Sequence, residues 1–356
     1  MNLSHNDVVV PSLTVIKPGR KKALTGPFSE SFDKCILSDN SEENSTPTMS
    51  ITHVKVDNVK VGRLNTAGCG VYYADNVLSS EECSAFRKCI DSCKDLTFWS
   101  QSKDESCSSD LNDLKMFRDA DTVEVKSTYI ADCIWRRIKN AFLISSEEDI
   151  PRRAEAIVNN IVVDLSNPEH NERDLTGLWL PVGLNHDLLF AKYSPNGCFA
   201  PHTDGRTVHD FNTRSFYSVI IFLSDIPISS GGGTRFYTDD TINSLICDGN
   251  HWTAAADKAV AEVESVAGRF LLFHQSLVHE GVPTDSSTSF CKYIIRSDIM
   301  YGRSPAVCDG EQDRAAFALF QQAEDLAELG DVSESIKHFQ RAFKLSPEMA
   351  RMMGHG

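Results

Sequence analysis

Two polar side chains in the stretch FAPHTDG have the types and the spacing of metal ligands. His202 and Asp204 are two residues apart, and alternate residues of a β-strand project from the same face. An imidazole and a carboxylate would therefore lie side by side, close enough to share one ion. The same pair is also common as ordinary solvent-facing polar residues, so further ligands must be found before a metal site is predicted.

Two histidines in the later stretch RFLLFHQSLVHEGVP could supply the third ligand. His274 and His279 are five residues apart, so on one continuous strand they would face opposite sides. His279 precedes Gly281 and Pro283, where a strand should end at the mouth of a barrel. We therefore predict His279 as the ligand, and His274 as a fully hydrogen-bonded histidine that lies behind the ligands or at the surface. Two histidines and one carboxylate on one face of an octahedron are typical of non-haem Fe(II) oxygenases.

Iron chemistry of this kind uses a dicarboxylate cosubstrate, one end of which chelates the metal. A cation is also needed, to hold the carboxylate at the other end of the cosubstrate. The stretch FCKYIIRSD offers Lys292 and Arg296, four residues apart and on the same face of one strand. Either could be the anchor. The glycines Gly231–Gly233 resemble a phosphate loop only superficially, because no Lys-Ser pair or helix follows them. They predict a turn or bulge between strands.

The elements that would position these residues change in type along the chain. GVYYADNVLSSEECSAFRKCIDSC predicts a strand and then a helix capped by Ser79 or Ser80. YIADCIWRRIKNAF predicts a second amphipathic helix, whereas CSSDLNDLKMF has no helical period and predicts a loop. From Asp187 onward, short β-rich runs bounded by turn residues favour a sandwich or barrel. Residues 237–262 interrupt them and predict an insertion over the sheet.

Four of these stretches together resemble a known family. FAKYSPNGCFAPHTDG, GGGTRFY, FHQSLVHEG and KYIIRSDIMY are similar to the 2-oxoglutarate- and Fe(II)-dependent dioxygenases of the prolyl 4-hydroxylase type, over roughly residues 70–303. The resemblance implies a mainly β fold with flanking helices and a double-stranded β-helix (jelly roll) core. It implies that the catalytic iron ligands are His202, Asp204 and His279. It also assigns the cosubstrate anchor to Lys292, with Arg296 as the alternative, and a hydrogen bond to the same carboxylate to Tyr193.

The resemblance implies a reaction and its cofactors. A carbon of the substrate would be hydroxylated while 2-oxoglutarate is converted to succinate and CO2, and a prolyl side chain in a protein or peptide is the favoured substrate. Fe(II), 2-oxoglutarate and O2 are implied, and ascorbate is a further cofactor that the family allows. The alternatives are a nucleic-acid demethylase or small-molecule hydroxylase on the same core, and a non-catalytic jelly roll that binds a partner. The complete ligand set argues against the last, because a non-catalytic protein would tolerate its loss.

Composition limits the partners and the compartment. A net charge of −15 over 356 residues disfavours binding to nucleic acid or to an anionic membrane surface. The eleven cysteines are scattered without a CxxC pair, and neither a signal peptide nor an apolar run of membrane-spanning length is evident. Free thiols and a cytoplasmic or nuclear location are therefore expected.

Changes in composition predict three regions. Residues 1–62 are rich in Ser, Asn, Thr and Lys and are predicted to be a disordered arm. Residues 63–305 should form the dioxygenase domain. Residues 306–356 contain two amphipathic segments joined at Gly330-Asp331, which resemble one tetratricopeptide-like helical hairpin. A single repeat is too short for a stable solenoid, so the hairpin should dock on the catalytic body or bind a partner protein.

Overall fold

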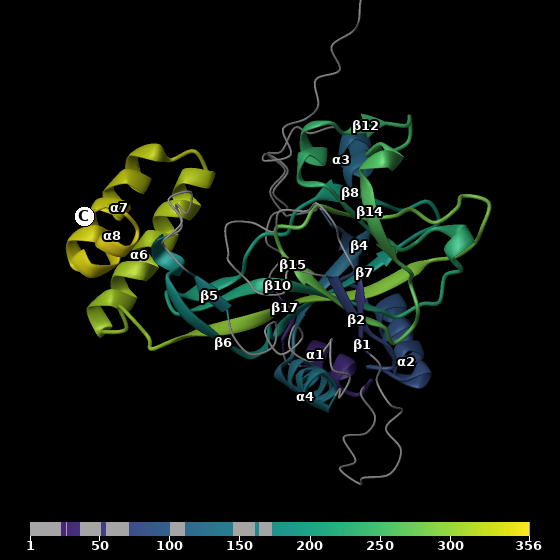
Figure 1. The fold of residues 1–356 in the computed structure, drawn as a ribbon, viewed down its shortest axis with the longest axis horizontal. Coiled ribbons are helices and arrows are strands. Elements are labelled where there is room, and N and C mark those ends of the chain that lie inside the picture. The colour runs from purple at the N-terminus through teal and green to yellow at the C-terminus, as the bar shows by residue number, and fades with distance from the viewer. Residues whose placement is uncertain are drawn as a thin grey trace, which may run out of the picture.

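The structure is a computed structural model that describes residues 23–25, 27–35, 51–54, 71–99, 111–144, 161–163 and 173–355. Two antiparallel sheets form the body of this described part, with helices on one side and a helical unit at one end (Figure 1). The large sheet has the spatial order β1 (Ile51–Val54), β2 (Val71–Ala74), β15 (Phe270–His274), β10 (Thr213–Phe222), β17 (Lys292–Ser304), β7 (Asp187–Tyr193), β4 (Asp121–Lys126) and β3 (Thr97–Phe98). Three more strands pair at its end: β5 (Ile161–Val163), β6 (Gly177–Leu184) and β9 (Val208–Asp210).

The small sheet carries two of the predicted ligands. Its order is β14 (Ala259–Val263), β11 (Thr234–Tyr237), β16 (His279–Gly281) and β8 (Phe199–His202). The register between β16 and β8 sets His279 directly opposite His202. Two sheets packed face to face, with helices outside, confirm the predicted mainly β jelly-roll fold.

The central strands are apolar on both faces because each face packs against a different layer. All five residues of β15 are buried. Phe270 and Leu272 belong to the cluster between the large sheet and the helices. Leu271 and Phe273 belong to the cluster between the two sheets. Alternation along a strand therefore separates two cores.

Helices α1, α2 and α4 cover the outer face of the large sheet (Figure 1). Helix α2 (Ser80–Ser92) begins with a capping box, in which Ser79 and Glu82 satisfy each other's backbone N–H groups. Helix α4 (Thr128–Ile144) buries Ile130, Ile134 and Ile138, which recur at helical spacing. The segment predicted to be a loop instead contains helix α3 (Leu111–Phe117).

The prediction of a disordered arm over residues 1–62 is wrong for the two elements described there. Helix α1 (Pro27–Asp33) buries Phe32, whose ring centroid lies 4.5 Å from that of Phe190. Strand β1 (Ile51–Val54) pairs with β2 at the edge of the large sheet. Apolar residues that pack on the core thus order parts of a segment whose average composition is polar. Most of the remaining arm lies outside the described residues.

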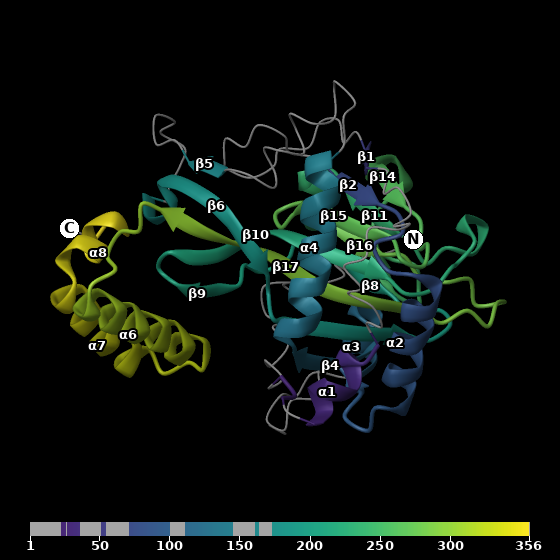
Figure 2. The same cartoon turned by 90° about the horizontal axis from the view of Figure 1, so that it is seen from below.

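The C-terminal region contains three helices. The predicted second segment is divided into α7 (Val332–Leu345) and α8 (Pro347–Met352), because Ser346 caps a new helix that has Pro347 in its first turn. Helix α6 (Glu311–Glu328) packs on the body through Phe317, whose ring contacts that of Phe211. Figure 2 shows this unit beyond the end of β6, β10 and β17.

The sequence led us to expect free thiols and no membrane-spanning segment, and both expectations can be compared with the described residues. Every cysteine in the described segments is a free thiol. Among the helices described, none combines the length and the apolar character needed to cross a bilayer.

Candidate metal centre and cation pocket

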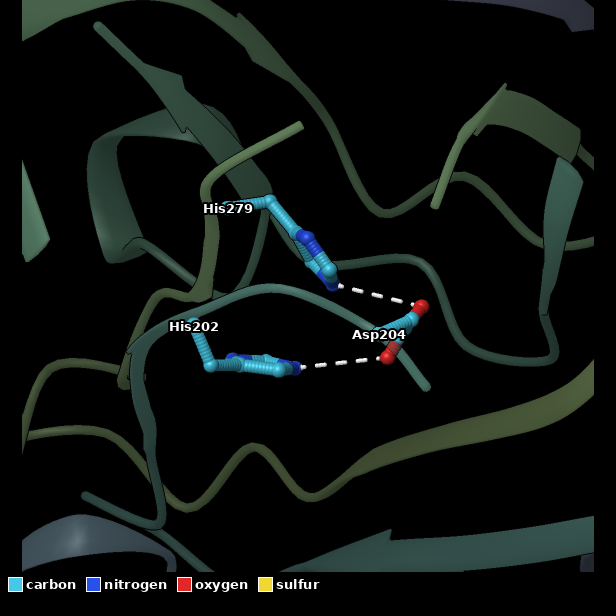
Figure 3. A group of neighbouring side chains, drawn as sticks. All are labelled: His202, Asp204 and His279. Atoms are coloured by element: carbon cyan, nitrogen blue, oxygen red, sulfur yellow. Dashed lines mark ion pairs between the residues drawn. The ribbon is translucent and has the colours of Figure 1, made fainter. Parts of the chain in front are cut away.

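The structure brings the three predicted ligands together between the ends of β8 and β16. Nε2 of His202 is 3.6 Å from Oδ1 of Asp204, and Nε2 of His279 is 3.7 Å from Oδ2 of the same carboxylate (Figure 3). Within the part of the chain that the structure describes, these three residues are the one group of His, Cys, Asp and Glu side chains whose donor atoms could hold a metal ion.

Each histidine is oriented by a backbone carbonyl two residues before it. Nδ1 of His202 donates to the carbonyl of Ala200 at 2.7 Å, and Nδ1 of His279 donates to that of Leu277 at 2.9 Å. The proton on Nδ1 leaves a lone pair on each Nε2, which faces the carboxylate. Burial, together with the neighbouring His202, lowers the pKa of His279 to about 4, so this imidazole is neutral at pH 7.

Stacking also restrains the ring of His202. The ring of Phe199 lies 3.6 Å from it, centroid to centroid, with an interplanar angle of 17°. Arg118 packs against the same phenyl ring, with its Cζ 4.5 Å from the ring centroid. Phe117, at the end of α3, meets Phe199 edge-on at 5.5 Å.

Asp204 is held in its charged form. Burial by itself would raise the pKa of Asp204, but Arg296, His279 and His202 lower it well below its usual range. Nη2 of Arg296 is 3.5 Å from Oδ2 of Asp204, and the hydroxyl of Ser218 donates to the same oxygen. Arg296 also pairs with the fully buried Asp298 at 3.0 Å. Arg296 thus lies within a carboxylate network beside the ligand.

The donor set fits a divalent transition metal. Two imidazole Nε2 atoms and one carboxylate converge. Each Nε2–carboxylate distance is below about 4.2 Å, which is twice a typical metal–donor bond of ~2.1 Å. An ion between them would neutralise the buried carboxylate and use the two Nε2 lone pairs. Three protein ligands on one face would leave other coordination positions for a cosubstrate and O2.

Lys292 provides a buried cation close to this centre. It is 3% exposed, and its Nζ donates to the carbonyl of Gly233 at 2.8 Å. Burial lowers the pKa of Lys292 to about 8, against the opposing effects of Glu262 and Glu280. Among the described residues, no carboxylate lies within ion-pair distance of Lys292. A buried ammonium that lacks a close carboxylate is a natural anchor for a carboxylate ligand.

Tyr193 is placed beside that cation. Tyr193 and Lys292 are directly opposite each other across β7 and β17, and Nζ is 5.5 Å from the centroid of the tyrosine ring. The side chain of Tyr193 is buried, and burial raises its pKa in spite of the neighbouring Arg118. The predicted contact between Tyr193 and a bound carboxylate stays a prediction.

His274 lies apart from the metal ligands. Its Nδ1 is 2.6 Å from the hydroxyl of Ser276, and its ring meets Tyr217 edge-on at 5.3 Å. Burial lowers the pKa of His274 to about 3. His274 is only 1% exposed and its Nε2 has no hydrogen-bond partner among the described residues, so the prediction of a surface or fully hydrogen-bonded histidine is wrong.

Several residues around the site were missed by the sequence analysis. Gly233 supplies the carbonyl for Lys292, and a Cβ there would come within 2.8 Å of the Val263 carbonyl. Glu280 is 1% exposed and accepts hydrogen bonds from the hydroxyls of Tyr237 and Thr253. Thr253 belongs to the insertion, whereas Tyr237 is the last residue of β11, so the hydrogen bond from Thr253 ties the insertion to the strand of His279. Only the glycine run gave a signal in the sequence, as the predicted turn.

One family model matches the segment that contains the site. Residues 188–297 match the 2OG-Fe(II) oxygenase superfamily. This match agrees with the predicted superfamily over the segment that carries all six predicted site residues. Together with the His-Asp-His centre, it also supports the predicted cofactors, Fe(II) and 2-oxoglutarate. No curated protein sequence matches the chain.

Several solved structures match the chain at 13–15% identity. A viral collagen prolyl hydroxylase from Paramecium bursaria Chlorella virus 1 with 2OG is 13% identical, covering 65% of this chain and 96% of that one, with a TM-score of 0.37. A prolyl-4-hydroxylase of Pseudomonas putida is 15% identical, covering 67% and 95%, with a TM-score of 0.36. HygX of Streptomyces hygroscopicus with nickel and 2-oxoglutarate is 13% identical, covering 68% and 85%, with a TM-score of 0.34.

Proposed function

We propose that this chain is an Fe(II)- and 2-oxoglutarate-dependent hydroxylase of the prolyl 4-hydroxylase type, which oxidises a prolyl carbon in a protein or peptide. One observation carries the proposal: the strand that contributes His279 to the His-Asp-His centre lies beside a buried lysine, whose Nζ is 3.8 Å from where a Cβ would stand on Gly281, and this lysine has no close carboxylate among the described residues. The centre suits the metal, and the lysine suits the far carboxylate of the cosubstrate.

Each of the chain's own residues has a distinct role in this proposal. His202, Asp204 and His279 hold Fe(II), and Lys292 holds the far carboxylate of 2-oxoglutarate by a charge-assisted bond. Arg296 keeps the carboxylate of Asp204 ionised and oriented. When bound, Fe(II) and 2-oxoglutarate supply the oxidation, in which O2 is consumed, succinate and CO2 are released, and one oxygen atom enters a substrate C–H bond.

The surroundings of β8 support an apolar substrate group. Trp99 and Phe117 are buried there, and Phe98, Phe199 and Trp252 are partly buried against them. A saturated ring such as that of proline would fit an aromatic wall better than a phosphate or sugar would. The net charge of −15 also disfavours nucleic acid.

The test is the release of succinate by the full-length chain with Fe(II), O2 and 2-oxoglutarate, with and without substrates. Peptides with and without proline and a methylated oligonucleotide should be compared. We expect succinate to increase with prolyl peptides, and the peptide to gain one oxygen atom by mass spectrometry. Stimulation by the oligonucleotide alone would favour a demethylase. No succinate under any condition, in folded protein that binds metal, would favour a non-catalytic binding protein.

A further inference from the structure

The helical unit at the C-terminus has an open groove on its surface. The groove lies between α6 and α7, has a volume of about 370 Å³, and is lined by Gln322, Asp325, Leu326, Leu329, Glu334 and His338. Leu326 is on α6, and Leu329 is the residue that caps the C-terminal end of this helix. The unit contacts the body elsewhere on α6, where Phe317 meets Phe211 and Gln321 donates to the carbonyl of Val208. The groove is therefore separate from the contact that joins the unit to the body.

Large apolar side chains are exposed around this end of the unit. Leu329 is 83% exposed, Val332 is 60% exposed and Ile336 is 50% exposed. These three exposed apolar residues lie within eight positions of one another. Leu329 lies in the turn after α6, and Val332 and Ile336 lie in the first part of α7. Grouped apolar exposure of this kind marks an interaction surface more often than an ordinary solvated helix end.

The charge around the groove is strongly negative. Between Gln322 and His338 the chain has five carboxylates and a single lysine. That lysine, Lys337, is paired with Glu334 at 2.6 Å. Asp325 and Glu334 line the groove from opposite helices, on either side of its leucines. A partner that fits this surface must combine an apolar side chain with neighbouring positive charge.

We propose that this groove binds a basic amphipathic helix of a partner protein, in which leucine-like residues on one face are flanked by lysine or arginine. The leucines of the groove would bury the apolar face. The carboxylates on both sides would pair with the flanking cations and select against acidic segments. This inference does not rest on the oxygenase activity proposed above.

The test uses a synthetic probe with the full-length chain. A fluorescent helix-forming peptide has leucine at positions i, i+3, i+4 and i+7 and lysine at the flanking positions, and its binding is followed by fluorescence polarisation. We expect saturable binding that weakens as salt is raised. A scrambled peptide, and one with glutamate in place of lysine, should bind at least about tenfold more weakly.

Variants of the groove make the test specific. Leu329→Ser should weaken binding of the lysine peptide about tenfold. Asp325→Lys combined with Glu334→Lys should abolish it and shift the preference to the glutamate peptide. Ile228→Ser and Asp257→Lys, which change an exposed apolar residue and an exposed carboxylate away from the groove, are the matched controls.

Three results would overturn the proposal. The lysine peptide could fail to bind, or it could bind the groove variants as well as the unaltered chain. Sedimentation could instead reveal a dimer that Leu329→Ser dissociates, in which case a second copy of this chain covers the groove. Leu329 and Asp325 are exposed and Glu334 is half-buried, and circular dichroism should confirm that each variant is folded before these results are compared.

Discussion

Nη2 of Arg296 lies 3.5 Å from Oδ2 of Asp204, so this arginine pairs with a carboxylate that faces both histidines of the centre. Lys292 is on the same face of β17, but its Nζ contacts only the carbonyl of Gly233 among the described hydrogen-bond acceptors. Lys292 and Arg296, which the sequence places on the same face of one strand, therefore have different partners. Their substitutions should have different effects.

Lys292→Ala should weaken 2-oxoglutarate binding about 30-fold or more, because it removes a charged partner worth ~2 kcal/mol or more. Titration of 2-oxoglutarate at saturating metal measures the effect. Arg296→Ala should change that affinity only a few-fold and should mainly weaken metal binding, since it releases Asp204. Lys258→Ala, at a lysine on the insertion, is the control. The reverse ranking would make Arg296 the anchor.

The affinity for 2-oxoglutarate should fall in mildly alkaline solution. Burial lowers the pKa of Lys292 to about 8, so the ammonium that binds the carboxylate is present below this pH and is lost above it. Affinity should decrease by up to about tenfold per pH unit above pH 8. Lys292→Arg keeps its charge across this range and should remove most of the decrease. Equal pH profiles in the two proteins would contradict this role for Lys292.

Phe199→Leu should weaken metal binding about tenfold, in the range found for residues that orient metal ligands. The substitution removes the aromatic face on which His202 stacks but keeps an apolar side chain. Binding of Mn(II), measured by calorimetry, tests it without depending on turnover. Phe290→Leu, at a more exposed phenylalanine, should leave binding unchanged. If both variants bind Mn(II) like the unaltered chain, stacking does not position His202.

A chain that ends at Arg303 should keep its chemistry and lose stability. All six predicted site residues precede that end, so release of succinate without substrate should persist. In the full chain Phe211 is only 2% exposed, because it packs against α6. Removal of α6 exposes this side chain and should lower the free energy of unfolding by about 2 kcal/mol or more. Thermal unfolding and succinate release measure the two effects. Loss of succinate release in truncated protein shown to be folded would place the helical unit in the active site.

The site residues that could be predicted are those whose relative orientation depends on their spacing along one strand. The spacing of His202 and Asp204, and that of Lys292 and Arg296, sets which residues share a strand face, whatever the rest of the fold. The sequence predicted that His279 ends a strand, whereas it begins β16, after the turn that follows β15, and faces His202 from there.

The rest of the site depends on contacts between distant segments. The pairing of Ser218 with Asp204 requires β10 to pass beside the metal centre, and no local pattern encodes that. Helix α3 was predicted to be a loop because its seven residues have no clear apolar period. It ends at Phe117, which packs on Phe199 more than 80 residues later. Helix α1 was missed for the same reason, since it is held by contacts with distant segments: buried Phe32 packs on Phe190, and the hydroxyl of Ser127 donates to Asp33.

The central claim is that His202, Asp204 and His279 hold the iron that drives 2-oxoglutarate turnover. The most direct measurement is Fe(II)-dependent succinate release, compared among the unaltered chain, His279→Ala and His274→Ala, with metal content determined for each folded protein. We predict one Fe(II) per chain and measurable succinate for the unaltered chain and for His274→Ala, and neither for His279→Ala. Full metal loading and turnover in His279→Ala, or their loss in folded His274→Ala alone, would contradict the account.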